Sequence, residues 1–304
     1  MASLKLTPLR KQQLGQPQAV YQISCEGKHC DCSQLGEHCR RGFFSLWLQA
    51  VYGLYFAEIH GLPAYVNFGD RPYLYSDPKK FLGNSNFWEY YYPQNRSKTA
   101  QVEVASRYVE DYPLRIWQRR HWNQLHEKIV STLNLRPEVE QYVQTLCSRF
   151  KGATLGIHVR LTDHPDEIEA VRMDQYHRIL EQEQHRFRYF FVATDDQRVI
   201  SNLIDRWGEE RILYQEAIRS QSRQAVHTNL QYRDRYHLGL EVLADCYALS
   251  KCQHCLLVHS NISYAALLLN PDLSFTLLET SNSRWQRWKT SLLYYLDQWG
   301  IRKM

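Results

Sequence analysis

The stretch "ATLGIHVRLTDHPDE", residues 153–167, opens the most regular part of the chain. Its apolar first half is typical of a buried strand, and that strand ends in His158 and Arg160. Residues two apart leave the same face of a strand, so these two nitrogen-rich side chains are aimed together. An acidic segment closes the stretch, and it contains Asp163, Asp166 and Glu167.

Strand and helix patterns alternate downstream of this stretch. Strands separated by helices of ten to fifteen residues indicate βαβ units and a mostly parallel sheet. The expected strands are 153–159, 189–194, 211–214, 254–259 and 274–279, and the expected helices are 174–186, 197–207, 236–251, 262–269 and 284–298.

Upstream, the pattern is that of a second α/β region. A long apolar helix is expected over 43–62 with its stop at Gly61, and a strand over 63–68. Residues 70–98 form an aromatic, turn-rich loop, and 101–150 is mostly helical by pattern. We therefore expect an N-terminal α/β domain over 1–150, a second over 151–285, and a C-terminal helix within 286–304 that packs back on the first.

Composition limits the class of protein. The 304 residues suffice for a large core, and the net charge of +5 is spread along the chain, which argues against a nucleic-acid binder. No run of eighteen apolar residues occurs, and the first residues lack the apolar centre of a signal peptide, so the expected location is the cytoplasm. The aromatic clusters in 70–98 are expected to be core, with sugar stacking as the alternative.

Four of the eight cysteines lie close together, at Cys25, Cys30, Cys32 and Cys39. Thiolates are zinc ligands, but the spacing is not that of paired C-x-x-C motifs, so reduced thiols are the favoured interpretation and a metal-binding interaction protein the alternative. Cys252 and Cys255 do form a C-x-x-C, within a helix end and a buried strand, and are interpreted as packing residues.

Parallel sheets bind ligands outside the carboxyl ends of their strands. The residues that follow the expected strands are polar, namely His158, Arg160 and Asp163, then Asp195 and Asp196, then Ser260, Asn261 and Ser263. The guanidinium of Arg160 matches phosphate oxygens, and a helix that begins at Ser260 and Asn261 offers free N–H groups, so a diphosphate site is expected.

Asp245 is the lone acid in an apolar helix stretch, where a charge is costly unless it is paired. A carboxylate there can accept two N–H groups from a guanine edge, although a structural salt bridge or an exposed face explains it equally well. The sequence contains neither G-x-G-x-x-G nor G-x-x-x-x-G-K-[ST], so the usual dinucleotide and P-loop phosphate sites are absent.

Three segments resemble, in order and spacing, the peptide motifs shared by the α-1,6-, α-1,2- and protein O-fucosyltransferases, including the rhizobial nodulation enzyme. They are "GIHVRLTD", "FVATDD" and "LADCYALSKCQHCLLVHSNISYAA", and residues 40–70 also resemble the glycine loop, helix and strand at the start of the family fold. The resemblance implies a GT-B fold, with two Rossmann-like domains facing a cleft, and inverting transfer of fucose from GDP-fucose without a metal.

The resemblance also implies roles for single residues. Arg160 falls on the arginine at the donor β-phosphate, His158 and Asp245 on the residues that recognise guanine, and Asp163 near the ribose. Ser260 and Asn261 fall on a serine pair at the phosphates, Asp195 in the second motif, and Gly42 in the glycine loop. Many members carry a second arginine where this chain has Leu161.

The general base is left open between Glu167 and Asp166, with Glu169 next, because two glutamates flank the family position. The acceptor is expected to be a glycan or another hydroxyl compound. Three alternatives remain: a transferase for another GDP-sugar or for a protein hydroxyl, a nucleotide-binding module without catalysis, and the metal-binding protein built on Cys25–Cys39.

Overall fold

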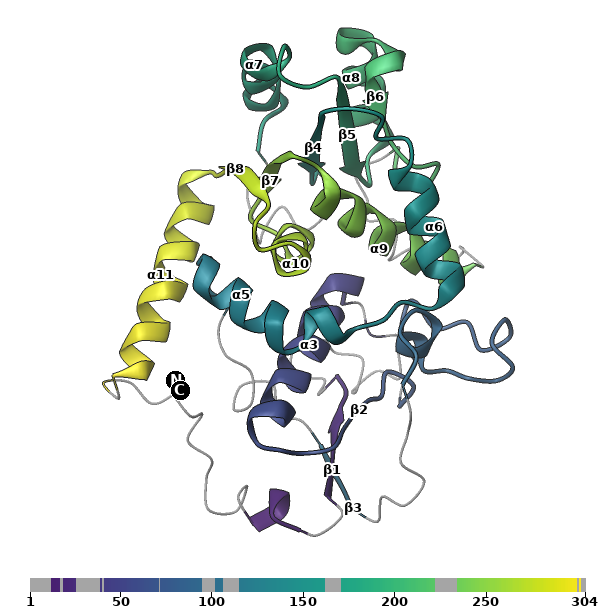
Figure 1. The fold of residues 1–304 in the computed structure, drawn as a ribbon, viewed down its shortest axis with the longest axis vertical. Coiled ribbons are helices and arrows are strands. Elements are labelled where there is room, and N and C mark those ends of the chain that lie inside the picture. Colours follow the sequence, from purple (N-terminus) through teal and green to yellow (C-terminus); the bar gives the residue numbers. More distant parts are fainter. Residues whose placement is uncertain are drawn as a thin grey trace. The chain divides into compact units, whose positions relative to one another are not determined.

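The computed structural model describes residues 12–16, 19–25, 39, 41–70, 72–94, 102–105, 115–161, 171–221, 234–299 and 301 (Figure 1). The chain forms two compact units. The first comprises Met1–Arg136 together with Trp288–Met304, and the second comprises Pro137–Arg287. Each unit is an α/β structure with its own parallel sheet.

The second unit is built on a five-stranded sheet in the order β6-β5-β4-β7-β8, with all four pairings parallel. Parallel neighbours require a crossover, which the helices between the strands supply. The strands are β4 (Thr154–Val159), β5 (Tyr189–Thr194), β6 (Ile212–Leu213), β7 (His254–Val258) and β8 (Ser274–Leu278). The helices are α6 (Pro137–Cys147), α7 (Met173–Glu183), α8 (Gln197–Trp207), a 3-10 turn Glu209–Arg211, α9 (Arg235–Lys251) and α10 (Asn261–Leu269).

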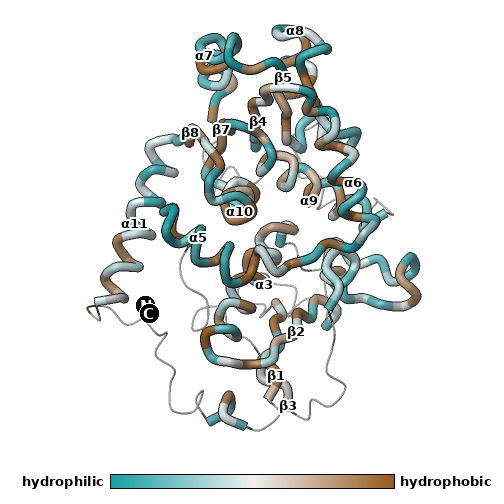
Figure 2. The backbone as a smooth tube through the Cα atoms, in the orientation of Figure 1, coloured by the Kyte–Doolittle hydropathy of each residue, from teal (hydrophilic) through white to brown (hydrophobic). Residues whose placement is uncertain are grey.

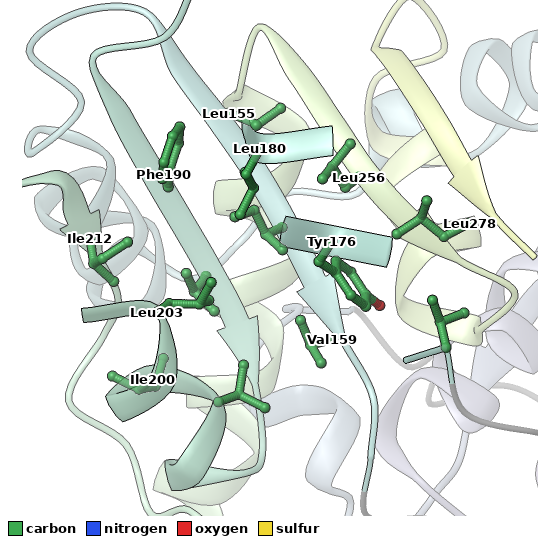
Figure 3. Close-up of a cluster of buried hydrophobic side chains, with 14 of the residues drawn as sticks. Leu155, Val159, Tyr176, Leu180, Phe190, Ile200, Leu203, Ile212, Leu256 and Leu278 are labelled. Carbon is green, nitrogen blue, oxygen red and sulfur yellow. The ribbon is translucent and has the colours of Figure 1, made fainter. Parts of the chain in front are cut away.

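One face of this sheet is covered by α7 and α8. Alternate residues of β4, including Leu155 and Val159, pack there against Leu180 of α7 and Leu203 of α8 (Figure 3). All four are at most 1% exposed, so burial of apolar area is the main force that holds this layer.

On the other face of β4, Gly156 has no side chain and leaves room for close packing. A Cβ at this position would lie 2.5 Å from the sulfur of Cys255 and 3.0 Å from Leu249 at the end of α9. The thiols of Cys252 and Cys255 are buried and donate to carbonyls of α9. These contacts confirm the packing role predicted for the C-x-x-C pair.

The first unit has a three-stranded parallel sheet in the order β2-β1-β3. Its elements are β1 (Ala19–Ile23), α3 (Phe43–Ile59), β2 (Ala64–Val66), a 3-10 helix Phe87–Tyr90, β3 (Val102–Ala105), α5 (Arg119–Lys128) and a 3-10 turn Val130–Thr132. Helix α3 is buried on several faces, as predicted, whereas α5 is teal over most of its length in Figure 2 and buries only Trp122 and Leu125. Gly61, at φ +64°, follows α3 and allows the chain to leave the helix.

The aromatic residues of segment 70–98 form the core of the first unit. Phe68 and Phe87 stack with centroids 5.2 Å apart, Tyr75 meets Phe43 edge-on at 5.3 Å, and Trp47 donates to the hydroxyl of Tyr92 at 2.9 Å. These rings are buried, so the core interpretation is confirmed for them and sugar stacking is not available to them.

Three features differ from the sequence expectations. Strands β1 and β3 were not expected, and β3 lies in a segment predicted to be mostly helical. The units divide at Arg136 and Pro137, before the expected boundary at 150, because α6 packs on α9 of the second unit.

The final helix α11 (Ser281–Gln298) begins among the residues of the second unit and ends among those of the first. Its later part belongs to the first unit, where Tyr295 donates to Gln118 at 2.6 Å and Tyr294 meets His121 edge-on at 4.9 Å. Within the described residues, no helix combines the length and the apolar character needed to cross a bilayer.

Candidate functional site

The second unit has one point where the order of its strands reverses. The chain runs outward from β4 to β5 and β6, then returns to place β7 on the other side of β4 and continues to β8. The crossovers therefore diverge between β4 and β7, and such a reversal opens a crevice at the carboxyl ends of the strands. We call this end of the sheet, where β4 ends at Val159, β5 at Thr194 and β7 at Val258, the carboxyl edge.

His158 connects the two strands that flank this reversal. Its Nδ1 lies 2.8 Å from the hydroxyl of Ser263 and 3.3 Å from that of Ser260, both of which follow β7. Its backbone carbonyl accepts a hydrogen bond from Tyr176 of α7 at 3.1 Å. The side chain is 3% exposed, so its ring is held in one place.

The environment of His158 keeps its imidazole neutral. Burial is the main cause, and the nearby charge of Arg160 adds to it, lowering the pKa of His158 to about 3. A neutral imidazole carries one donor and one acceptor nitrogen, and the serine hydroxyls can complement either tautomer at Nδ1. His158 is thus a hydrogen-bonding group near neutral pH and not a cation.

Ser260 begins α10. Its hydroxyl accepts from the backbone N–H of Ser263 at 3.1 Å, which is the usual cap of a helix start, and Asn261 is the first helical residue. The free N–H groups and the positive dipole end of this helix therefore lie next to His158 at the carboxyl edge, an arrangement that favours an anion.

Arg160 and Asp195 follow neighbouring strands at the same level. Val159 of β4 is paired with Thr194 of β5, so the next residue of each strand stands side by side at the carboxyl edge. Adjacent strands lie about 4.8 Å apart, so the backbones of Arg160 and Asp195 are neighbours there. Asp196, in contrast, caps α8 and pairs with Arg198, with Nε 2.9 Å from Oδ1, and its role is structural.

Asp245 of α9 belongs to the same end of the unit, because its carboxyl group interacts with Asp195. Burial, as the largest cause, raises the pKa of Asp245 to about 8, against the opposing effect of Arg219 and of a hydrogen bond from Gln215. Its Oδ1 is buried without a hydrogen-bond partner among the described residues. A buried acceptor without a partner among the described residues is a candidate contact for a ligand.

Four residues near Asp245 were not found by sequence reasoning: Tyr142, Gln215, Arg219 and Glu241. Tyr142 comes from α6, and Gln215 and Arg219 come from the loop 214–221, so chain distance hides their proximity to Asp245. Glu241 stands one helical turn before Asp245 on α9, and this spacing was the available sequence signal.

The remaining predicted site residues lie in the first unit or outside the described residues. Gly42 belongs to the first unit, where it precedes α3; with a φ of −64° and no described atom within 4 Å of an added Cβ, neither its backbone nor its packing requires glycine. Asp163, Asp166, Glu167 and Glu169 lie outside the described residues.

The described residues contain no group of three His, Cys, Asp or Glu side chains that could hold a metal ion. Of the N-terminal cysteines, Cys25 and Cys39 are described; their sulfurs are 3.7 Å apart, and Arg41 donates to the sulfur of Cys25 at 3.7 Å. Cys30 and Cys32 lie outside the described residues, so the metal-binding alternative stays untested.

No family model and no curated protein matches the sequence. Among solved structures, this chain is similar to NodZ α-1,6-fucosyltransferase co-crystallised with GDP, at 14% identity and a TM-score of 0.48, over 86% of this chain and 95% of that one. The fucosyltransferase NodZ from Bradyrhizobium gives the same values. POFUT1 in complex with GDP-fucose is similar at 10% identity and a TM-score of 0.39, over 88% of this chain and 76% of that one.

Proposed function

We propose that this protein is an inverting glycosyltransferase that transfers fucose from GDP-fucose to a hydroxyl acceptor such as a glycan. The observation that carries the proposal is the convergence of the resembling motifs at one end of one sheet. His158 lies at the end of β4 and Arg160 follows it, Ser260 and Ser263 follow β7, and His158 bonds both serines. The resemblance assigns these same residues to a GDP-sugar.

The chemistry of the site fits the departure of GDP. As the glycosidic bond breaks, negative charge develops on the β-phosphate, and the Arg160 guanidinium can stabilise it with two parallel N–H bonds. The start of α10 adds backbone donors at the same edge. Removing the phosphate-stabilising group is expected to reduce turnover by about 100- to 1000-fold.

The acceptor hydroxyl loses a proton in an inverting transfer, on the face opposite GDP. We propose Glu167 or Asp166 as the base, with Glu169 next, as the resemblance implies. Strong stabilisation of the leaving group makes the transition state resemble an oxocarbenium ion, which lowers the demand on that base. Transfer is proposed to proceed without a metal and in the cytoplasm.

A donor screen that measures released GDP tests the proposal directly. GDP-fucose is offered beside other GDP-sugars, with water as the default acceptor and a glycan mixture as the alternative. Arg160→Ala is expected to lose turnover while the protein stays folded, and Arg160→Lys to retain a part of it because the charge remains. Arg172→Ala is the matched control, since Arg172 is an exposed arginine of the same unit that pairs with Asp174.

The outcomes separate the alternatives. Release of GDP from a different GDP-sugar would change the proposed donor and leave the proposed site unchanged. Binding of GDP without any release would indicate a nucleotide-binding module without catalysis. An Arg160→Ala protein with near-normal turnover would contradict the role given to Arg160.

A further inference from the structure

Cys25 and Cys39 form a close pair of thiols that the proposed function does not use. Cys25 comes two residues after β1, and Cys39 lies shortly before α3 in the same unit. Their sulfur atoms are 3.7 Å apart, and one thiol can donate to the other. Their side chains are 1% and 0% exposed. An S–S bond is about 2.05 Å long, so an approach of less than about 2 Å would join the two sulfurs.

The backbones of both cysteines are anchored to one short segment. The N–H of Cys25 donates to the hydroxyl of Tyr73 at 3.1 Å, and this hydroxyl in turn donates to Asp70 at 2.9 Å. The N–H of Cys39 donates to the carbonyl of Pro72 at 2.9 Å, and Cys39 forms a parallel bridge with Tyr73. Because neighbouring residues hold both backbones, the closeness of the two sulfurs is a property of the fold.

Arg41 places a positive charge beside one of the two sulfurs. Its Nη1 donates to the sulfur of Cys25 at 3.7 Å. The guanidinium is held there because Nε donates to the hydroxyl of Ser45 at 3.1 Å and Nη1 also donates to Gln49. A neighbouring cation stabilises the thiolate, which is the nucleophile in thiol oxidation. Cys25 is therefore the better attacking thiol, and Cys39 stands within reach of it as the resolving thiol.

Cys252 and Cys255 provide a contrast within the same chain. Their thiols donate to carbonyls of α9 at 3.4 and 3.3 Å. Burial, and after it the interaction with Cys255, raises the pKa of the Cys252 thiol well above its ordinary value. A thiol that resists ionisation is a poor nucleophile. We therefore expect this pair to be oxidised less readily, although its C-x-x-C spacing is the one that sequence reasoning associates with redox chemistry.

We propose that Cys25 and Cys39 are a redox pair that a peroxide converts into a reversible disulfide. The Cys25 thiolate attacks one oxygen of hydrogen peroxide, the O–O bond breaks, and Cys25 becomes a sulfenic acid while the other oxygen leaves as water. Cys39 then loses its proton and attacks the sulfur of Cys25, the S–O bond breaks, and a second water leaves. The two thiols thus give two electrons and two protons to the peroxide, and a dithiol reverses the change.

A zinc site on the same two thiols is the competing interpretation, because two thiolates of a tetrahedral zinc also lie about 3.8 Å apart. The charge of Arg41 disfavours a second cation at Cys25. No group of three candidate ligands occurs in the part of the chain that the structure describes. The disulfide needs only the two thiols that are present there. It is also independent of the proposed function, since it uses residues of the first unit alone.

Titration of the full-length protein with hydrogen peroxide tests the proposal. After each dose the protein is unfolded in an excess of alkylating agent, and its peptides are mapped by mass spectrometry without reduction. We expect Cys25 and Cys39 to be joined at doses that leave Cys252 and Cys255 alkylated, and dithiothreitol to restore all free thiols. The midpoint of thermal unfolding is expected to rise by about 4 °C or more on oxidation, because the bond closes a loop in the unfolded chain.

Variants separate the roles of the two thiols. Cys39→Ser is expected to leave Cys25 as a sulfenic acid, which dimedone traps, and to abolish the thermal shift. Arg41→Gln is expected to slow disulfide formation several-fold, and Arg41→Lys is its matched control because it keeps the charge. A Cys30→Ser, Cys32→Ser double variant keeps the pair and is expected to form the bond as the wild type does.

Three results would overturn the inference. The first is a Cys25 joined to Cys30 or Cys32 in place of Cys39. The second is stoichiometric zinc in the purified protein, with oxidation that begins only after a chelator removes it, which would establish a metal site instead. The third is a wild type that keeps Cys25 and Cys39 as free thiols at doses that oxidise Cys252 and Cys255.

Discussion

His158 shows how much of this site depends on the neutral form of one side chain. Its partners at Nδ1 are hydroxyl groups, and burial beside Arg160 lowers its pKa to about 3. In the unfolded chain the same imidazole titrates near its ordinary value of 6.5. Between these two values the unfolded state binds a proton that the folded state does not, so the contribution of His158 to stability is lost as pH falls through this window.

We therefore expect His158→Asn to reduce the loss of unfolding free energy that the wild type undergoes between pH 7 and pH 5. The variant is less stable than the wild type at pH 7, because it loses a buried hydrogen bond worth about 1 kcal/mol, but the difference narrows by pH 5. Urea unfolding at pH 7 and at pH 5 measures the difference in unfolding free energy between the two proteins. His185→Gln is the control, since His185 is exposed, and a constant difference at both pH values would contradict the expectation.

At the scale of the element, β4 decides where the site stands. Residues Leu155, Ile157 and Val159 pack on α7 and α8, so the residues between them face α9. Gly156 allows the thiols of Cys252 and Cys255 to approach that face closely. We expect the position of His158, two residues further on the same face, to depend on this close packing.

Gly156→Ala tests that dependence. The new Cβ would lie 2.5 Å from the sulfur of Cys255, so we expect overpacking to cost about 1–3 kcal/mol of unfolding free energy. Cys255→Ala removes the sulfur, and the double variant is expected to lose less than the sum of the two single changes. Chemical denaturation of all four proteins gives the coupling, and strictly additive losses would show that Cys255 does not carry the clash.

At the scale of the whole molecule, the proposed donor site belongs to the second unit. Hydrogen exchange with and without GDP is expected to show protection at the carboxyl edge, in segments 158–161, 194–197 and 258–263. The opposite end of the same sheet, near Thr154, Tyr189 and His254, serves as the internal control. Equal protection at both ends, or protection confined to the first unit, would contradict the assignment.

Hydrogen exchange at Gly42 also addresses the first unit. Protection of residues 41–46 on addition of the nucleotide would support the donor role that the resemblance gives to this glycine. The cleft between two facing domains, which the resemblance implies, stays a prediction.

The sequence alone determined the α/β class, the alternating order of the second unit and the residues at three strand ends, because local periodicity and chain order carry that information. It missed β1 and β3, which are short strands with weak patterns, and it placed the unit boundary too late because the packing of α6 on α9 is a long-range contact. Only the tertiary structure brought Arg219 to Asp245, since the two residues come from a loop and a helix that meet in space. Burial, which no local pattern reports, is the main reason why the pKa of His158 is lowered and the pKa of Asp245 is raised.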